Sequence, residues 1–202
     1  APGGIRFGLA AIKNIGRGFI PKVMAEREES GAFRDLEDFC RRMCGTDLNK
    51  RALENLIKSG ACDCFGLHRS QMLQIYETVL DSVTASRRKN VEGQLDLFGG
   101  FLEESSDPLP AVHIPELPEL PRQELMQLEK ETTGLYLSGH PMDEYRPLLA
   151  SVHAAPIGQI MESFTEEGGS FRDEQGVTVA GIVQTVKMKT TKNNSMMAYV
   201  RL

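Results

Sequence analysis

The chain has 202 residues, of which 41% are hydrophobic and 25% are charged. This length and hydrophobic content suffice for one large or two small globular domains and exclude a wholly unfolded chain. No stretch approaches the roughly 18 consecutive apolar residues of a membrane-spanning helix, and the first residues lack the basic-then-apolar pattern of a signal peptide. We therefore expect a soluble, cytoplasmic protein without a membrane partner.

The net charge of −5 is unevenly distributed along the chain. Residues 1–89 hold 15 Lys and Arg against 11 Asp and Glu, a net of +4, whereas residues 90–202 hold 8 against 17, a net of −9. A mildly basic first part is compatible with a phosphate-containing partner, although solvated helix faces often carry such an excess. Charge alone does not identify the partner.

Residues 1–89 alternate helical patterns with short glycine-containing turns and contain no period-two strand. We expect helices over residues 6–14, 19–29, 35–43, 49–58 and 68–88. Arg87, Arg88 and Lys89 close the last helix with cations that suit the negative end of its dipole, and they could equally contact nucleic acid. This part is predicted to be an all-helical domain.

Four cysteines, Cys40, Cys44, Cys62 and Cys64, are too few for a secreted disulfide scaffold. Their spacing admits a tetrahedral zinc site, because four thiolates can surround one ion. Zinc ligands usually lie in tight turns, however, and Cys40 falls within a predicted helix. We therefore expect free, buried thiols and no metal.

Residues 90–120 differ in composition from the preceding part. They contain glycines, an acidic run at residues 103–107 and prolines at 108, 110, 115 and 118. Such a segment has few side chains for a core, and its prolines favour extended conformations, so we predict a flexible linker.

The C-terminal part is predicted to contain short helices followed by strands. We expect residues 121–150 to form a helical connector, in which Leu125, Leu128 and Thr132 line one face of a helix that Gly134 ends. Alternating β-branched runs at residues 177–188 and 196–202, separated by Asn193-Asn194, predict a β-hairpin. Two strands alone do not make a stable sheet, so we expect residues 151–202 to be the first part of an incomplete β-domain.

The turn Ile15-Gly16-Arg17-Gly18, between two predicted helices, resembles that of the helix-hairpin-helix family. Glycines let the backbone approach a phosphate, and the N–H groups that begin the next helix point toward the anion, with Lys13 and Arg17 adding charge. The alternative is a glycine helix end without a ligand. A second turn, with Lys58 and Gly60, either completes a tandem pair of DNA-binding turns or is only a helix end.

The peptide Gln94-Leu95-Asp96-Leu97-Phe98 lies in the predicted linker and matches the short peptide with which bacterial proteins bind the replication sliding clamp. An exposed apolar pair in such a segment gains nothing from folding and is best explained as an anchor for a pocket on a partner. Leu97 and Phe98 fill that pocket, and Gln94 fixes the register by hydrogen bonding. The alternative is a stray strand that packs on the parent fold.

The stretches at residues 7–16, 36–42, 48–61, 129–141 and 179–183 resemble the alpha subunits of bacterial DNA polymerase III, and the resemblance covers nearly the whole chain. It implies a tandem helix-hairpin-helix bundle, then the clamp-binding linker, then short helices and the first strands of a truncated β-barrel, an OB-fold. Lys187, Lys189 and Lys192 would lie near a single-stranded template. Alternatively, they are charges that protect an edge strand.

The resemblance also implies a function. The family is a DNA-directed DNA polymerase, a nucleotidyltransferase expected to use Mg²⁺, but its catalytic carboxylates lie upstream of this segment, which we expect to be inactive alone and to hold no cofactor. The implied function is non-specific binding of double-stranded DNA and tethering to the sliding clamp (beta subunit), beside other replisome subunits. The alternatives are a stand-alone helix-hairpin-helix repair factor and a protein-interaction scaffold that does not bind DNA.

Overall fold

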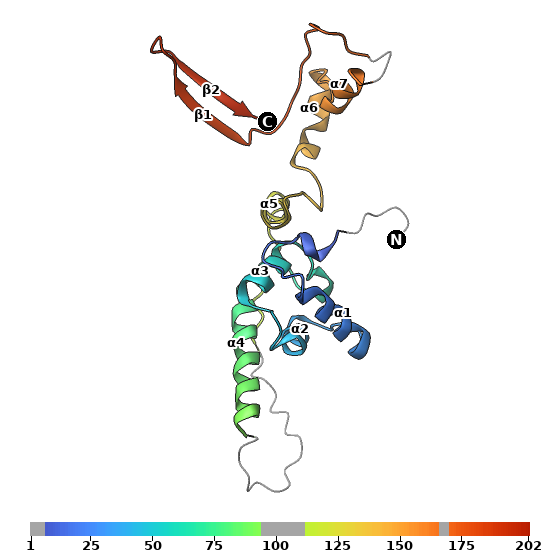
Figure 1. Cartoon of the computed structure of the whole chain (residues 1–202), viewed down its shortest axis with the longest axis vertical. Coiled ribbons are helices and arrows are strands. Elements are labelled where there is room, and N and C mark those ends of the chain that lie inside the picture. The colour runs from blue at the N-terminus through green and yellow to red at the C-terminus, as the bar shows by residue number, and fades with distance from the viewer. Residues whose placement is uncertain (1–6, 94–111, 166–169) are drawn as a thin grey trace. The chain divides into compact units, whose positions relative to one another are not determined.

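The computed structural model describes residues 7–93, 112–165 and 170–202. The chain divides into two compact units, Ala1–Leu137 and Ser138–Leu202 (Figure 1). The predicted fold class is confirmed, because helices make up most of the described chain and two antiparallel strands follow them. The finer domain boundaries at residues 89, 120 and 150 stay predictions.

The first unit is helical. Its elements are η1 (Leu9–Ala11), α1 (Phe19–Ser30), α2 (Leu36–Met43), α3 (Lys50–Lys58), η2 (Asp63–Phe65), α4 (Arg69–Gly93) and α5 (Arg122–Thr133). Side-chain caps begin two of these helices where the sequence predicts them: Asp35 Oδ1 accepts the Asp38 N–H at 2.7 Å, and Asn49 Oδ1 accepts the Ala52 N–H at 3.0 Å.

The core of the first unit lies between α4, the longest helix in Figure 1, and the pair α2 and α3. Its buried members on α4 are Met72, Ile75, Val79, Leu80 and Val83, which recur at helical spacing as expected. The helix α5 packs against α3, so a segment that follows the predicted linker belongs to the same unit.

The prediction of a helix over residues 6–14 is wrong. Its described part forms only the 3₁₀ turn Leu9–Ala11, and Asn14 has a φ of +62°, which no α-helix contains. The Lys13 N–H donates to the carbonyl of Thr132 at 2.9 Å instead of to a helical acceptor. The apolar residues whose spacing predicted a helix lie in a loop instead, and Ile12 and Ile15 of that loop are both buried.

Two further details of the helices differ from prediction. The helix α4 continues to Gly93, so Arg87 and Arg88 do not lie in its last turn, and helix capping does not explain them. On α5, the buried residues are Met126, Glu129 and Thr132, so Thr132 is buried as predicted, whereas Leu125 and Leu128 are only partly buried. Glu129 occupies a buried position because Arg69 pairs with its carboxylate.

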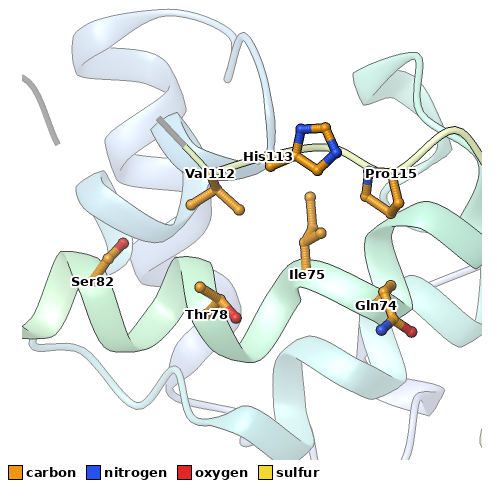
Figure 2. A pocket seen from close by; sticks show the side chains of 7 residues that line it. All are labelled: Gln74, Ile75, Thr78, Ser82, Val112, His113 and Pro115. Carbon is orange, nitrogen blue, oxygen red and sulfur yellow. The ribbon is translucent and has the colours of Figure 1, made fainter. Parts of the chain in front are cut away.

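Residues 112–120, which we call the strap, are extended and lie against α4. The Gln71 amide donates to the Pro115 carbonyl at 2.9 Å, and the Ser70 hydroxyl donates to the Pro118 carbonyl at 2.7 Å. A hollow of about 490 Å³ separates part of the strap from α4. Figure 2 shows its lining, with Gln74, Ile75, Thr78 and Ser82 on the helix and Val112, His113 and Pro115 on the strap.

Glu119 fixes the end of the strap to the first turn of α4. Its Oε2 accepts the Arg69 N–H at 2.9 Å, and its Oε1 accepts the Ser70 N–H at 3.2 Å and the Leu120 N–H at 2.8 Å. A carboxylate at the N-terminus of a helix is favourably placed relative to the helix dipole. The strap therefore attaches the segment that precedes α5 to the rest of the first unit.

The second unit contains η3 (Pro141–Tyr145), α6 (Arg146–Ser151), α7 (Ile157–Ser163), β1 (Thr185–Thr190) and β2 (Met196–Arg201). The two strands form the predicted antiparallel hairpin, but β1 begins at Thr185, later than the alternation from residue 177 predicted. His140 begins η3, since its Nδ1 accepts the Met142 N–H at 3.1 Å. Within the described ranges of both units, no helix has the length and apolar content needed to cross a membrane.

Candidate nucleic-acid interface

The turn Gly16-Arg17-Gly18 is held at both ends by buried residues and is itself exposed. Ile15 is 9% exposed and Phe19 is 2% exposed, so both anchor the turn in the core. The Phe19 N–H donates to the Gly16 carbonyl at 3.0 Å and closes the turn. A Cβ on Gly16 would have no neighbour within 4 Å, so the backbone here faces open space. The turn presents its peptide groups to solvent.

The helix that follows the turn, α1, begins without a side-chain cap, and its first turn contains no acidic residue. The first N–H groups of a helix have no partner within the helix and carry a partial positive charge. An anion that approaches the turn therefore meets both the glycine backbone and the positive end of α1.

Lys13 and Arg17 flank the turn, and both are exposed. Neither side chain makes an ion pair with a residue that the structure describes. The backbone of Lys13 is fixed, since its N–H bonds the Thr132 carbonyl and its carbonyl accepts the Asn55 amide at 2.8 Å. The predicted cations therefore lie on a turn that α3 and α5 hold in place.

A carboxylate that the sequence analysis missed also borders the turn. Asp47 lies in the loop between α2 and α3, with Oδ2 2.9 Å from Lys22 Nζ and 3.9 Å from the place where a Cβ on Gly18 would stand. No motif marks this residue, because only the folding of the loop brings it to the turn. Its negative charge opposes an anion at this place.

The second predicted turn differs from the first. Gly60 has a φ of +82°, and a Cβ there would overlap the guanidinium of Arg69. Lys58 Nζ pairs with Glu54 Oε1 at 2.7 Å, one turn back on α3. Both residues thus have structural roles, and the DNA contacts predicted for them stay predictions.

Arg69 is the centre of an ionic cluster that joins the second turn to α4 and α5, in which Arg69 and Glu129 are buried and Asp63 is exposed. Its Nε and Nη2 donate to the two carboxylate oxygens of Asp63 at 2.9 and 2.7 Å, and its Nη1 donates to Glu129 Oε1 at 3.1 Å. The other oxygen of Glu129 accepts the Leu137 N–H at 2.9 Å. Hydrophobic periodicity gives no sign of this cluster, because its members are charged.

Among the residues that the structure describes, no three or more His, Cys, Asp or Glu side chains are grouped so that they could hold a metal ion. Cys40 and Cys62 are buried, and Cys64 is exposed. Burial raises the pKa of Cys40 to about 12 and also raises the pKa of Cys62. Both buried thiols are therefore protonated at neutral pH and are poor nucleophiles.

The basic residues of the two strands and Tyr199 share one face of the β-hairpin. Its register pairs Lys187 with Tyr199 and Lys189 with Met197, and places Arg201 on the same face opposite Thr185. The other face holds Val186, Met188, Thr190, Met196, Ala198 and Val200. Lys192 lies in the turn between the strands and not in the paired part of the hairpin. Tyr199 and Arg201 were not predicted as contact residues, because the register was unknown.

The peptide Gln94-Leu95-Asp96-Leu97-Phe98 lies outside the described residues. Its predicted contact with the sliding clamp stays a prediction.

Comparison with known proteins identifies relatives over nearly the whole chain. A family model described as "Helix-hairpin-helix motif" matches residues 1–72. The DNA polymerase III subunit alpha of Saccharopolyspora erythraea is 36% identical over 203 residues, covering 98% of this chain and 16% of that protein. The subunits of Vibrio cholerae and Buchnera aphidicola are 33% and 34% identical, each covering 99% of this chain and 16% of the relative.

The chain thus spans about 16% of the length of the curated relatives that it matches. The similarity is not limited to the helix-hairpin-helix match, since it continues through the strap, α5 and the second unit. The chain therefore belongs to the DNA polymerase III subunit alpha family, of which it represents one segment with a helix-hairpin-helix motif.

Proposed function

We propose that this segment binds the backbone of duplex DNA at the turn Gly16-Arg17-Gly18, as part of a replicative polymerase that is also tethered to the sliding clamp. The observation that carries the proposal is the exposed glycine turn held between buried Ile15 and Phe19, inside the residues that match the helix-hairpin-helix family. Lys13 and Arg17 supply charge beside it.

Such a contact recognises charge and shape rather than base sequence. Phosphate contacts position a duplex but carry no sequence information, and each neutralised phosphate releases counterions, so that affinity falls as salt concentration rises. The turn has few groups that can contact a phosphate, and the negative charge of Asp47 repels one. We therefore expect the isolated segment to bind duplex DNA with moderate affinity and a shallow salt dependence.

Tethering is the second part of the proposed function. Gln94 and the apolar residues that follow it in the chain would dock on the clamp, which raises the local concentration of the polymerase at DNA. Nucleotide transfer itself is proposed for the whole family member, with Mg²⁺ held by residues outside this segment. The segment contributes binding.

A second nucleic-acid contact is proposed for the β-hairpin. Tyr199 stands on one face with Lys187, Lys189 and Arg201, and an aromatic side chain among cations is the combination with which single strands are bound by stacking and charge. The opposite, apolar face is exposed in the described residues, with Val186 and Val200 at 53% and 52%. This supports the proposal that further strands of an OB-fold cover that face.

Duplex binding is tested by fluorescence anisotropy with a labelled DNA duplex of arbitrary sequence over a series of salt concentrations. The wild-type segment should bind with an affinity that falls with salt, and Lys13→Gln/Arg17→Gln should lower the slope of log K against log salt by roughly 1 to 2 units. Arg27→Gln/Arg122→Gln, which removes the same charge from exposed sites elsewhere in the first unit, is the control. A wild-type segment that binds no duplex at any salt concentration favours the scaffold alternative.

Tethering is tested by calorimetry with a bacterial sliding clamp. The wild-type segment should bind, and Leu97→Ala/Phe98→Ala should not, whereas Phe101→Ala/Leu102→Ala in the same stretch should bind like wild type. If the control variant loses binding as fully as the test variant, the assignment to residues 94–98 fails. If wild type itself does not bind, the peptide match is accidental.

A further inference from the structure

A cationic hollow of about 600 Å³ lies between the C-terminal half of α4 and the loop that joins α2 to α3. The loop contributes residues 44–46 and 48–49, and α3 contributes Lys50 at its start. From α4 come Asp81, Arg87 and Arg88 together with apolar and hydroxyl side chains. Its charged lining thus consists of three cations and one carboxylate.

The two arginines carry the positive charge of this hollow. Lys50 Nζ is neutralised by Asp81 Oδ2 at 2.9 Å and Glu77 Oε2 at 3.0 Å. Arg87 Nη1 donates to the Cys44 carbonyl, which orients the guanidinium without neutralising it. Arg88 is exposed and forms no ion pair with any residue that the structure describes.

Helix capping does not explain these arginines. Because α4 continues to Gly93, they lie before its last turn, where the effect of the helix dipole has faded. The first turn of α3, on the other side of the hollow, contains no acidic residue, but the Asn49 side chain already caps it by accepting the Ala52 N–H. It is therefore the two guanidinium groups that favour a bound anion, since they form no ion pair with the residues that the structure describes.

The loop between α2 and α3 borders both the hollow and the glycine turn. Asp47 of that loop pairs with Lys22 on α1 and stands 3.9 Å from the Cβ position of Gly18, while the residues on both sides of Asp47 line the hollow. The loop that borders the glycine turn therefore also borders the hollow that contains Arg87 and Arg88.

We propose that Arg87 and Arg88 bind a second phosphodiester group of the same duplex backbone that contacts the glycine turn. This inference rests on the proposed function and extends it, because two separated phosphate contacts fix the direction of the duplex across the first unit, which a single contact does not. Guanidinium groups suit this role, since their donors match two oxygens of one phosphate.

The test is duplex binding of the 202-residue chain at several salt concentrations with three double variants that each remove two positive charges. Arg87→Gln/Arg88→Gln should lower the slope of log K against log salt by roughly 1 to 2 units, and Lys13→Gln/Arg17→Gln should do so independently. Arg27→Gln/Arg122→Gln should leave the slope within error of wild type. Arg87→Lys/Arg88→Lys keeps the charge and should retain most of the slope.

The variants separate this inference from the proposed function. If the hollow variant behaves like the control while the turn variant loses affinity, the inference is overturned and duplex binding at the turn stands. If only the hollow variant loses affinity, Arg87 and Arg88 contact the duplex but the turn does not, and this result overturns both the proposed contact at the turn and the two-point contact inferred here. Unchanged helical circular dichroism and an unchanged urea midpoint show that any loss reflects binding, and the lysine variant provides the same comparison if the glutamine variant unfolds.

Inorganic phosphate distinguishes a duplex contact from a site for a small anion. Broadening of the ³¹P resonance of phosphate by the wild-type chain, lost in the hollow variant, together with unchanged duplex binding by that variant, would assign the hollow to a free anion and overturn the duplex contact. Loss of duplex affinity in the hollow variant, with no broadening of free phosphate, is the result expected.

Discussion

Arg69 Nη1 lies 3.1 Å from Glu129 Oε1, and the two side chains are only 8% and 1% exposed. The pair joins the first turn of α4 to α5, although 60 positions separate the two residues in the chain. Asp63 supplies the second carboxylate of the cluster, so the guanidinium is bonded on both of its edges. The helix that follows the strap is thus locked to the helix-hairpin-helix region by buried charge.

Removal of one partner from this pair should destabilise the first unit strongly. Glu129→Ala leaves part of the Arg69 charge buried without its partner, and we expect a loss of about 3 kcal/mol in the free energy of unfolding. Urea unfolding followed by circular dichroism measures it. Glu131→Ala, at an exposed position on the same helix, should change stability by less than about 0.5 kcal/mol. Equal effects of the two substitutions would show that the pair contributes nothing.

Gly60 and Gly66 form a matched pair, because both have positive φ and only one is crowded. Gly60→Ala adds a Cβ that overlaps Arg69, whereas Gly66→Ala adds one with nothing within 4 Å. The backbone conformation alone should cost about 1 to 2 kcal/mol at either position. Gly60→Ala should cost at least ~1 kcal/mol more, because the buried guanidinium must move. Thermal unfolding of both variants gives the difference, and similar costs would mean that Arg69 adapts freely.

Attachment of the strap should depend on pH through Glu119. Burial by itself would raise the pKa of Glu119, but the three backbone N–H groups that donate to its carboxylate, together with His68, hold this pKa below its ordinary value of 4.5. A group with a lowered pKa in the folded state stabilises fully above its unfolded pKa, and the contribution is lost as pH falls through the folded pKa. Wild type should therefore be more stable than Glu119→Gln at pH 7, and the difference should shrink below about pH 4.5. A difference that is the same at pH 3 and pH 7 would contradict this.

Asp47→Asn should strengthen duplex binding. The carboxylate stands beside Gly18, where a phosphate would approach, and its removal relieves a repulsion and frees Lys22. We expect a ~3-fold gain in affinity at low ionic strength that disappears at high salt, because exposed charges are screened. Anisotropy at two salt concentrations measures it. Glu28→Gln, at an exposed position on α1, controls for net charge, and an equal gain in that variant would remove Asp47 from the interface.

Much of this fold could be predicted from the sequence, because contacts between residues a few positions apart determine where many helices and turns begin and end. Asp35 and Asn49 mark the starts of α2 and α3 through hydrogen bonds to residues three positions away, and Gly31 and Gly134 mark helix ends through positive φ. The hairpin followed from alternation and an Asn-Asn turn. In each case the determining contact lies within a few residues of the position that it fixes.

Other features depend on contacts that are distant in sequence. The spacing around Ile12 imitates a helix, but the Lys13 N–H bonds to Thr132 on α5, and the loop that results buries the same apolar residues. Glu129 is polar and yet buried, which no hydrophobic pattern predicts without knowledge of Arg69. The approach of Asp47 to the glycine turn likewise depends on how α1, α2 and α3 pack together.

The chain leaves α4 at Gly93 and is beside the same helix again at Val112, which packs on the core. The 18 residues in between therefore begin and end on one body rather than joining two. Since the entropy of closing such a loop grows only slowly with its length, by about 0.6 kcal/mol per doubling, insertions and deletions there should be tolerated thermodynamically. If residues 94–98 dock on a partner as proposed, the segments around them can be lengthened or shortened at little cost to the assembly of the helices on either side.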